Sequence, residues 1–179
     1  MDDFILHKKS VISSADCIKT IGIFEYNKEN HKRWEQFDHT LSEAFVRADE
    51  LPLCIGNPLH DMVEDYRKKY SGLDLLSQSW SLYSNIKIQR YYPNEGYTRL
   101  HCENDAEAPD MRHLRILAWM IYLNDVKDGG HTEFPVQDKK FQPREGDMLM
   151  WPAYWTHPHR GVVSKTETKY IMTGWYAFN

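Results

Sequence analysis

The sequence has little cysteine and no long apolar run, and both absences exclude classes of protein. Its cysteines, Cys17, Cys54 and Cys102, are widely spaced and form no Cys-x-x-Cys pair. This odd set does not suit a disulfide scaffold, and it favours a reducing, cytoplasmic location. The longest apolar run, Ile116–Leu123, is far shorter than the ~20 residues of a membrane helix. The chain opens with Met-Asp-Asp, without the basic segment of a secretory signal, so we expect no membrane association.

Excess positive charge is also absent. Lysine and arginine together number 22, against 26 aspartates and glutamates, which gives a formal net charge of −4. A protein that binds nucleic acid through phosphate contacts is basic on at least one face, so we expect no nucleic-acid partner. The 179 residues, of which 41% are hydrophobic, are enough for one domain with a sizeable core and too few for two ordinary domains.

Several catalytic signatures do not occur. The sequence has no His-Glu-x-x-His of zinc peptidases, no Pro-Cys-x-x-Cys of nucleobase deaminases and no Gly-x-Ser-x-Gly of serine hydrolases. Walker and dinucleotide-binding glycine motifs are missing as well. What the sequence does contain is nine histidines, several of them near carboxylates or aromatic residues in the second half. Because histidine is the commonest metal ligand, these positions are the first candidates for a site.

The segment 1–79 is predicted to be mainly helical. Polar capping residues open a short helix over Ser13–Tyr26, and a second amphipathic pattern covers Leu59–Tyr70. Between them, the segment His31–Val46 has aromatic and aliphatic residues at spacings of three and four, which predicts another amphipathic helix. The residues of that stripe are Trp34, Phe37, Leu41 and Phe45.

From residue 80 the pattern changes to short β-rich runs separated by turns. Alternation and turn residues predict strands over Ser84–Tyr92, Ile116–Leu123, His131–Pro135, Asp147–Trp151 and Lys169–Phe178. The glycine-rich turn before the third of these predicts a hairpin that pairs it with the second. Many short strands with regular turns indicate a sandwich or a barrel. We therefore predict a single α+β domain over 1–179, with helical support from 1–79 and a jelly-roll core over 80–179.

Two pairs of potential metal ligands lie within the β-rich half. His101 and Glu103 are two positions apart, so on a strand both side chains point to one face. A later segment contains His157 and His159 at the same spacing. Two histidines and one carboxylate form the facial triad that suits non-haem Fe(II) with open coordination positions. A His-x-Glu pair is a weak signal by itself, and its value depends on the residues that follow it.

Two cations lie at the edges of apolar runs. Lys169 is ten residues after His159 and opens the last predicted strand, and Arg115 precedes the apolar run at 116–123. A buried cation is costly unless an anion neutralises it, so each residue is a candidate anion-binding group. The alternative, which is favoured for Lys169 taken alone, is that it begins a strand at the surface.

Taken in order, these features resemble a known family. The match covers residues 84–178, and each motif is weak alone, but their order and spacing together are specific. They resemble the prolyl-4-hydroxylase-like branch of the Fe(II)/2-oxoglutarate-dependent dioxygenases. The motifs are His101-x-Glu103, Tyr122-Leu123-Asn124-Asp125-Val126, Gly129-Gly130-His131-Thr132-Glu133-Phe134-Pro135, Pro143-x-x-Gly146-Asp147, His159-Arg160-Gly161-Val162, Lys169 and Trp175.

The resemblance implies a fold, cofactors and roles for individual residues. It implies a double-stranded β-helix that binds Fe(II) through His101, Glu103 and His159, with 2-oxoglutarate as cosubstrate and ascorbate as a reductant. Lys169 matches the basic residue that pairs with the distal carboxylate of 2-oxoglutarate. Four further positions match residues that line the cosubstrate pocket in relatives. They are Tyr92, Arg115, Tyr122 and Trp175.

The sequence departs from the family at one ligand position. The usual motif is His-x-Asp, whereas position 103 is glutamate, and the extra methylene extends the carboxylate by about one C–C bond, ~1.5 Å. Glu103 is preferred over Asp105 because it keeps the two-residue spacing from His101. His159 is preferred over His157 because of its distance from Lys169 and the Arg-Gly-Val that follows it.

The expected function follows from this resemblance. We expect hydroxylation of a C–H bond, in a prolyl residue of a peptide or protein, with O2 and 2-oxoglutarate consumed and succinate and CO2 released. A small-molecule substrate remains open, as does the oligomeric state. Two alternatives are a non-catalytic, degenerate metal-binding jelly-roll module, in which Glu103 marks decay, and a cupin-like metalloenzyme that does not use 2-oxoglutarate and can dispense with Lys169.

Overall fold

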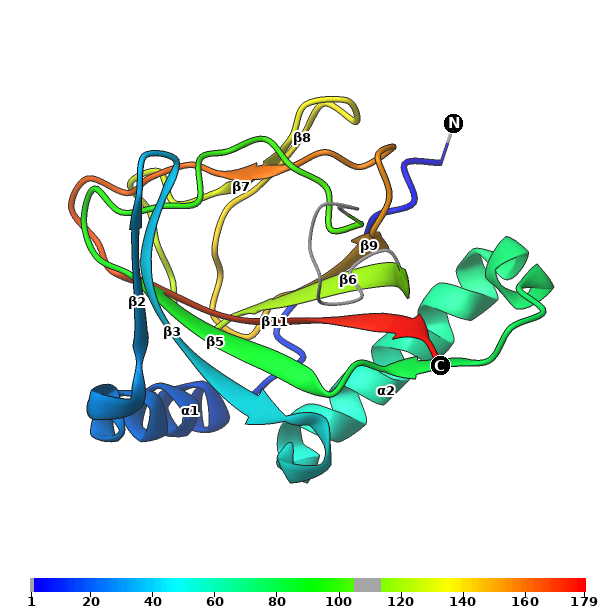
Figure 1. The fold of residues 1–179 in the computed structure, drawn as a ribbon, viewed down its shortest axis with the longest axis horizontal. Coiled ribbons are helices and arrows are strands. Elements are labelled where there is room, and N and C mark those ends of the chain that lie inside the picture. The colour runs from blue at the N-terminus through cyan, green and yellow to red at the C-terminus, as the bar shows by residue number, and fades with distance from the viewer. Residues whose placement is uncertain (1, 105–113) are drawn as a thin grey trace.

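An antiparallel sheet of eight strands forms the centre of the part of the chain that the computed structural model describes, residues 2–104 and 114–179 (Figure 1). Its strands pair in the order β1 (Leu6–Lys8), β9 (Met148–Pro152), β6 (Arg115–Tyr122), β11 (Lys169–Phe178), β5 (Asn85–Tyr91), β3 (His39–Arg47) and β2 (Lys32–Gln36), and β4 (Trp80–Leu82) also pairs with β11. A smaller sheet contains β10 (Arg160–Gly161), β7 (Thr132–Phe134) and β8 (Lys139–Phe141). The antiparallel arrangement confirms the predicted α+β, jelly-roll class.

Two helices cover one face of the main sheet, and the smaller sheet lies over the other (Figure 1). Helix α1 (Ser14–Tyr26) begins where Ser13 accepts a hydrogen bond from the Asp16 amide, as its capping residues predict. Helix α2 (Leu53–Lys69) begins six residues earlier than the sequence pattern indicates and includes Pro58. Short 3-10 turns, η1 (Lys28–Asn30), η2 (Ala48–Glu50) and η3 (Ser71–Leu75), join these elements. No helix in the described ranges is long and apolar enough to cross a membrane.

The helix predicted over His31–Val46 is wrong, because this segment folds into the hairpin of β2 and β3. The tight turn places Trp34 directly opposite Leu41, so the two side chains share a face although they are seven residues apart. Phe37 is at the tip and is fully exposed, and Phe45 is half exposed. The seven-residue spacing of Trp34 and Leu41 is thus the same in this hairpin as it would be in an amphipathic helix. Strands β2 and β3 form one edge of the main sheet, although residues 1–79 are predicted to be mainly helical.

The strand at His131–Pro135 exists as β7, but its predicted pairing is wrong. β7 pairs with β8 and β10 in the smaller sheet, whereas β6 pairs with β9 and β11. The glycine turn that precedes β7 therefore carries the chain from one sheet to the other instead of closing a hairpin. Gly129 and Gly130 both have a φ of +69°, a conformation that other residues rarely adopt.

Both faces of the main sheet are buried, which explains why every residue of β6 is buried. Leu117, Trp119 and Ile121 face the helices, and the residues between them face the smaller sheet. Ala118, Met120 and Tyr122 belong to that second face, together with Trp151 and Ile171. The sheet thus separates two apolar clusters, of which the second surrounds the predicted site.

Candidate metal centre

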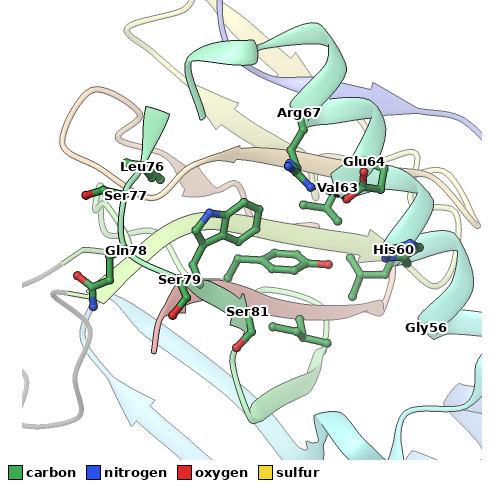
Figure 2. A pocket seen from close by; sticks show the side chains of 14 residues that line it. Gly56, His60, Val63, Glu64, Arg67, Leu76, Ser77, Gln78, Ser79 and Ser81 are labelled. Atoms are coloured by element: carbon green, nitrogen blue, oxygen red, sulfur yellow. Dashed lines mark hydrogen bonds and ion pairs between the residues drawn. The ribbon is translucent and has the colours of Figure 1, made fainter. Parts of the chain in front are cut away.

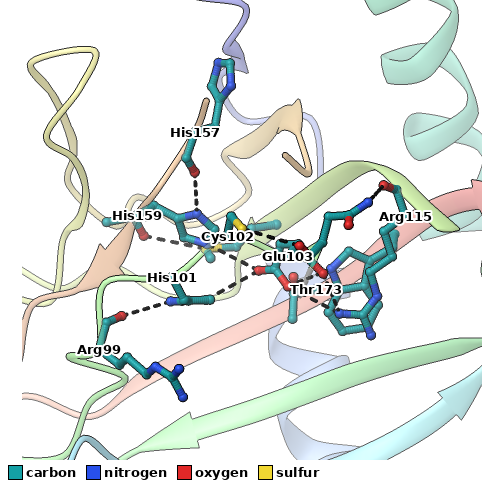
Figure 3. Close-up of polar contacts among 12 residues, drawn as sticks. Arg99, His101, Cys102, Glu103, Arg115, His157, His159 and Thr173 are labelled. Carbon is teal, nitrogen blue, oxygen red and sulfur yellow. Dashed lines mark hydrogen bonds and ion pairs between the residues drawn. The ribbon is translucent and has the colours of Figure 1, made fainter. Parts of the chain in front are cut away.

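Three side chains converge at one end of the space between the two sheets (Figure 3). One ligand atom from each of His101, Glu103 and His159 lies within 4.8 Å of the other two. Glu103 Oε1 is 3.2 Å from His159 Nε2 and 3.6 Å from His101 Nε2. Among the described residues these are the side chains that could together hold a metal ion.

The backbone holds the two histidines opposite each other. His101 and His159 form an antiparallel bridge in which each amide donates to the other's carbonyl, at 3.0 and 2.9 Å. The amides of Glu103 and Asn104 both donate to the carbonyl of Ala153, at 3.0 and 2.8 Å. The segment from His101 to Asn104 is therefore not the regular strand that the two-residue spacing assumes. These backbone hydrogen bonds nevertheless orient the side chains of His101 and Glu103 toward the same point.

Each histidine presents its Nε2 to the cluster. His101 Nδ1 donates to the carbonyl of Arg99 at 2.9 Å, and His159 Nδ1 donates to the carbonyl of His157 at 3.1 Å. A proton held on Nδ1 by a carbonyl turns Nε2 toward the cluster, where it donates to Glu103 when protonated and offers its lone pair to a metal when neutral. Both rings are therefore oriented as metal-binding histidines usually are.

The second oxygen of the glutamate is held by other partners. Trp175 Nε1 donates to Glu103 Oε2 at 2.9 Å, and Arg115 Nη1 lies 3.5 Å from the same oxygen. Burial alone would raise the pKa of Glu103, but hydrogen bonds and charge from the two histidines outweigh it and hold that pKa well below its usual value. Burial would lower the pKa of His101, and the neighbouring carboxylate reverses that shift. The cluster therefore contains an ionised carboxylate at neutral pH.

This donor set fits Fe(II). Two imidazole nitrogens and one carboxylate oxygen on one side of an ion leave further coordination positions for exogenous ligands, which is the arrangement of non-haem iron oxygenases. A structural zinc site would instead surround the ion with four protein ligands. The described residues supply three, and they open onto a cavity.

The cavity beside the cluster has a volume of about 160 Å³. Its walls come mainly from the inward-facing residues of β5 and β11, and from the loops that carry the three possible ligands. The lining residues are Lys87, Gln89, Tyr91, Tyr97, Arg99, His101, Cys102, Glu103, Arg115, Met120, Thr132, His159, Gly161, Lys169, Ile171, Thr173 and Trp175.

Lys169 is a buried cation in the wall of this cavity. It is 5% exposed, its ammonium donates to the carbonyl of Gly130 at 3.0 Å, and the same group lies 4.8 Å from the centre of the Tyr91 ring. No carboxylate of the described residues pairs with it, and burial lowers its pKa to about 8. The alternative of a surface lysine at the start of a strand is therefore wrong, and the cavity offers a positive charge to an anion.

The four other positions predicted for the cosubstrate pocket divide into two pairs. Arg115 and Trp175 line the cavity, with the guanidinium carbon 3.6 Å from the centre of the indole ring. Tyr122 lies behind the wall, because its hydroxyl donates to Thr132 at 2.7 Å and Thr132 is the residue that lines the cavity. Tyr92 lies outside the cavity: it is 45% exposed and stacks with Arg90 at 4.2 Å.

Tyr91 is the tyrosine that the sequence reasoning missed. It is 4% exposed, lines the cavity and is paired in register with Lys169 across β5 and β11. Strand alternation could have identified it, because Lys87, Gln89 and Tyr91 share one face of β5. Tyr92 has the opposite parity and follows the end of the strand.

The alternatives at the ligand positions have different outcomes. Both ring nitrogens of His157 are occupied away from the cluster, Nε2 by the carbonyl of Asp3 and Nδ1 by the hydroxyl of Thr156, each at 2.9 Å. His157 therefore supports the loop, and His159 joins the cluster. Asp105 lies outside the described residues.

A larger hollow lies on the other face of the main sheet, between α2 and β4 (Figure 2). It has a volume of about 670 Å³, and its lining includes Trp80, Tyr176 and Arg67. Arg67 is already paired with Glu64 and Asp74. None of the three cluster residues lines it, so the sheet separates this groove from the candidate metal centre.

Comparisons with known proteins agree with this geometry. The sequence model of the 2OG-Fe(II) oxygenase superfamily matches residues 86–177, just over half of the chain. A protein of Acanthamoeba polyphaga mimivirus with the name "Putative prolyl 4-hydroxylase" is 30% identical, over 51% of this chain and 44% of its own length. The present chain thus spans less than half of that relative.

Solved structures show the same fold. The viral collagen prolyl hydroxylase of Paramecium bursaria Chlorella virus-1, in complex with 2-oxoglutarate, superposes with a TM-score of 0.72 at 17% identity, over 98% of this chain and 97% of that one. A prolyl hydroxylase of Trichoplax adhaerens, in complex with a peptide fragment of hypoxia inducible factor, gives 0.72 at 16% identity, over 98% and 84%. From the family match and the triad beside a buried lysine, we conclude that the chain belongs to the 2OG-Fe(II) oxygenase superfamily.

Proposed function

We propose that this protein is an Fe(II)-dependent dioxygenase that consumes O2 and 2-oxoglutarate, places one oxygen atom in a substrate C–H bond and the other in succinate, and releases CO2. The observation that carries the proposal is the presence, in one cavity, of a two-histidine, one-carboxylate cluster and a buried lysine that pairs with no carboxylate of the described residues. His101, Glu103 and His159 hold the metal. Bound Fe(II) supplies the redox chemistry that couples decarboxylation of 2-oxoglutarate to oxidation of the substrate.

The role of Lys169 is to bind the distal carboxylate of 2-oxoglutarate. A carboxylate at its ammonium gains a charge-assisted hydrogen bond in a site from which water is largely excluded. The charges support this role, because Fe(II), the Glu103 carboxylate and dianionic 2-oxoglutarate together carry one negative charge, and a buried anion needs cationic partners. Arg115 lies beside Glu103, which leaves Lys169 as a cation for the cosubstrate.

The substrate class that we propose is a prolyl residue in a peptide or protein. Its support is the activity named for two proteins of the same fold, the viral collagen prolyl hydroxylase and the Trichoplax adhaerens prolyl hydroxylase, the second of which has a peptide bound. An aromatic side chain in the cavity wall also suits a proline ring. Tyr97 lines the cavity, stacks on His39 at 4.9 Å and lies tilted against His101 at 4.4 Å.

The test is succinate formation from 2-oxoglutarate by protein loaded with Fe(II) and supplied with ascorbate. Peptides that contain proline are compared with matched peptides in which alanine replaces it, and mass spectrometry detects a gain of one oxygen. We expect proline-dependent succinate formation and a hydroxylated peptide. Lys169→Ala is the matched variant: it should still bind Fe(II) while losing 2-oxoglutarate binding.

Other results would favour the alternatives. If the protein neither binds Fe(II) nor forms succinate, the degenerate module is the better description. Turnover that is independent of 2-oxoglutarate, and unaffected in Lys169→Ala, would favour the cupin-like metalloenzyme. Succinate formation with hydroxylation of a residue other than proline would retain the dioxygenase and replace the substrate.

A further inference from the structure

The two carboxylate oxygens of Glu103 have different surroundings. Oε1 faces the histidines, at 3.2 Å from His159 Nε2 and 3.6 Å from His101 Nε2. Oε2 faces away, where it accepts a hydrogen bond from Trp175 Nε1 at 2.9 Å and lies 3.5 Å from Arg115 Nη1. One oxygen therefore faces the two histidines, where a metal ion would lie, and the other is held by Trp175 and Arg115.

We propose that Trp175 and Arg115 are positioning residues that hold the Glu103 carboxylate by Oε2, so that it offers Oε1 alone to the metal. This inference rests on the metal site of the proposed function, but not on its turnover. A glutamate side chain has several rotatable bonds, and ordering it in a binding-competent rotamer opposes metal binding by entropy. The indole and the guanidinium order it in advance.

Arg115 contacts both Glu103 and Trp175, and so stabilises their relative position. Its Nη1 also donates to the backbone carbonyl of Glu103 at 3.2 Å, and its guanidinium carbon lies 3.6 Å from the centre of the Trp175 ring. The backbone carbonyl of Arg115 in turn accepts a hydrogen bond from the Asn104 side chain at 3.1 Å. Arg115 and Trp175 are 6% and 4% exposed, so little water competes for these contacts.

The same geometry gives the glutamate at position 103 a role of its own. An aspartate is shorter by about one C–C bond, ~1.5 Å, so on the same backbone we expect it to lose either the bond to the indole or its place beside the histidines. On this proposal the extra methylene serves the contact with Trp175.

The first experiment observes the hydrogen bond itself, without metal or turnover. In a proton–nitrogen NMR spectrum each tryptophan gives one indole resonance, and Trp175→Phe identifies the one from Trp175. We expect Glu103→Gln, which keeps the size of the side chain and removes its charge, to shift that resonance upfield and leave the others in place. An unmoved Trp175 resonance would overturn the proposal.

The second experiment measures metal affinity by titrating the metal-free protein with Co(II) and following its visible absorbance. We expect Trp175→Phe to weaken Co(II) binding by about 10- to 100-fold, the usual effect of losing a group that orients a ligand. Trp34→Phe is the matched control, because Trp34 makes the same kind of bond, to Glu43 Oε1 at 2.8 Å, away from the cluster. It should leave Co(II) binding unchanged.

A double-mutant cycle tests whether the long carboxylate and the indole act together. Glu103→Asp should weaken Co(II) binding in the wild-type background and have a smaller effect in the Trp175→Phe background, because the anchor is already lost there. Equal effects in both backgrounds, or tight binding by Trp175→Phe, would overturn the proposal. A protein that binds Co(II) in this pattern but forms no succinate would overturn the proposed function alone.

Discussion

The two faces of the main sheet both bury apolar side chains but differ in what else they bury. On the helix face, Trp119 and Ile121 of β6 belong to the same cluster as Ile55 and Met62 of α2, all nearly inaccessible to solvent. On the opposite face, apolar residues of the same strand share the space with an open cavity that contains the cluster and Lys169. In β6, the side chains that face the helices therefore contribute mainly to stability, and those that face the smaller sheet help to form the cavity.

The difference shows what each face contributes to folding. A close-packed apolar face stabilises the fold through burial, at about 25 cal/mol per Å² of apolar surface. A face that buries charges loses part of that gain to desolvation. Substitutions on the helix face should therefore change stability and leave the chemistry intact, whereas substitutions on the cavity face should do the reverse.

The largest expected effect separates chemistry from stability on the cavity face. His101→Ala removes one of the three proposed ligands, and we expect metal binding and succinate formation to fall below detection while the thermal midpoint changes little. Metal titration and circular dichroism measure the two quantities. The matched variant is His157→Ala, which removes a neighbouring imidazole outside the cluster and should retain metal binding. Loss of metal binding in His157→Ala with retention in His101→Ala would reverse the ligand assignment.

On the helix face the expected effect is the opposite. Ile55 is fully buried in α2, and Ile55→Ala should lower the free energy of unfolding by about 2–5 kcal/mol through lost burial and a residual cavity. Urea unfolding measures this change, and metal affinity should equal that of the wild type under conditions where the variant is folded. A large change in metal affinity would show that the two faces are energetically coupled through the sheet.

Replacing Lys169 should affect stability and cosubstrate binding in opposite directions. Lys169→Met removes a buried cation whose pKa burial lowers from 10.5 to about 8, and it also removes one hydrogen bond, to Gly130. We expect the protein without cosubstrate to be more stable by about 1–2 kcal/mol. Binding of 2-oxoglutarate should weaken by about 100-fold. Calorimetric melting and isothermal titration test the two halves, and a less stable variant would contradict the first.

The smallest effect is a dependence of cosubstrate binding on pH. Below a pKa of about 8 Lys169 is protonated and can pair with a carboxylate, and above it the charge is lost. The affinity for 2-oxoglutarate should therefore be steady up to about pH 8 and fall as pH rises further, by at most tenfold per unit. In Lys169→Met this dependence should disappear. If it persists there, another group is responsible for it.

Local sequence patterns predicted the elements whose environment is simple. The strands at 84–92, 116–123 and 169–178 correspond closely to β5, β6 and β11, because long apolar or alternating runs have few other ways to be buried. The hairpin of β2 and β3 was mistaken for a helix because a tight turn brings Trp34 and Leu41 together at a helical spacing. Hydrophobic periodicity alone cannot distinguish an amphipathic helix from a tight hairpin unless the position of the turn is known.

The candidate site could be predicted only as far as its parts are local. His101, Glu103, His159 and Lys169 come from motifs, and the structure brings the first three together in the cavity that Lys169 lines. The choice of Tyr92 failed on strand parity, which places Tyr91 in the cavity. The hydrogen bond between Trp175 and Glu103 joins residues that are 72 positions apart in the sequence. A local sequence pattern cannot predict a contact between residues so far apart.

The position of β11 has a consequence for how the protein acquires its fold. This strand follows all of its neighbours in sequence, yet it lies between β5 and β6 and also pairs with β4. The sheet therefore cannot close until the chain has been extended through Phe178, and such long-range pairing slows folding. Lys169 and Trp175 lie on this strand, so the groups proposed to hold the cosubstrate and Glu103 take their places only when β11 pairs at the centre of the sheet.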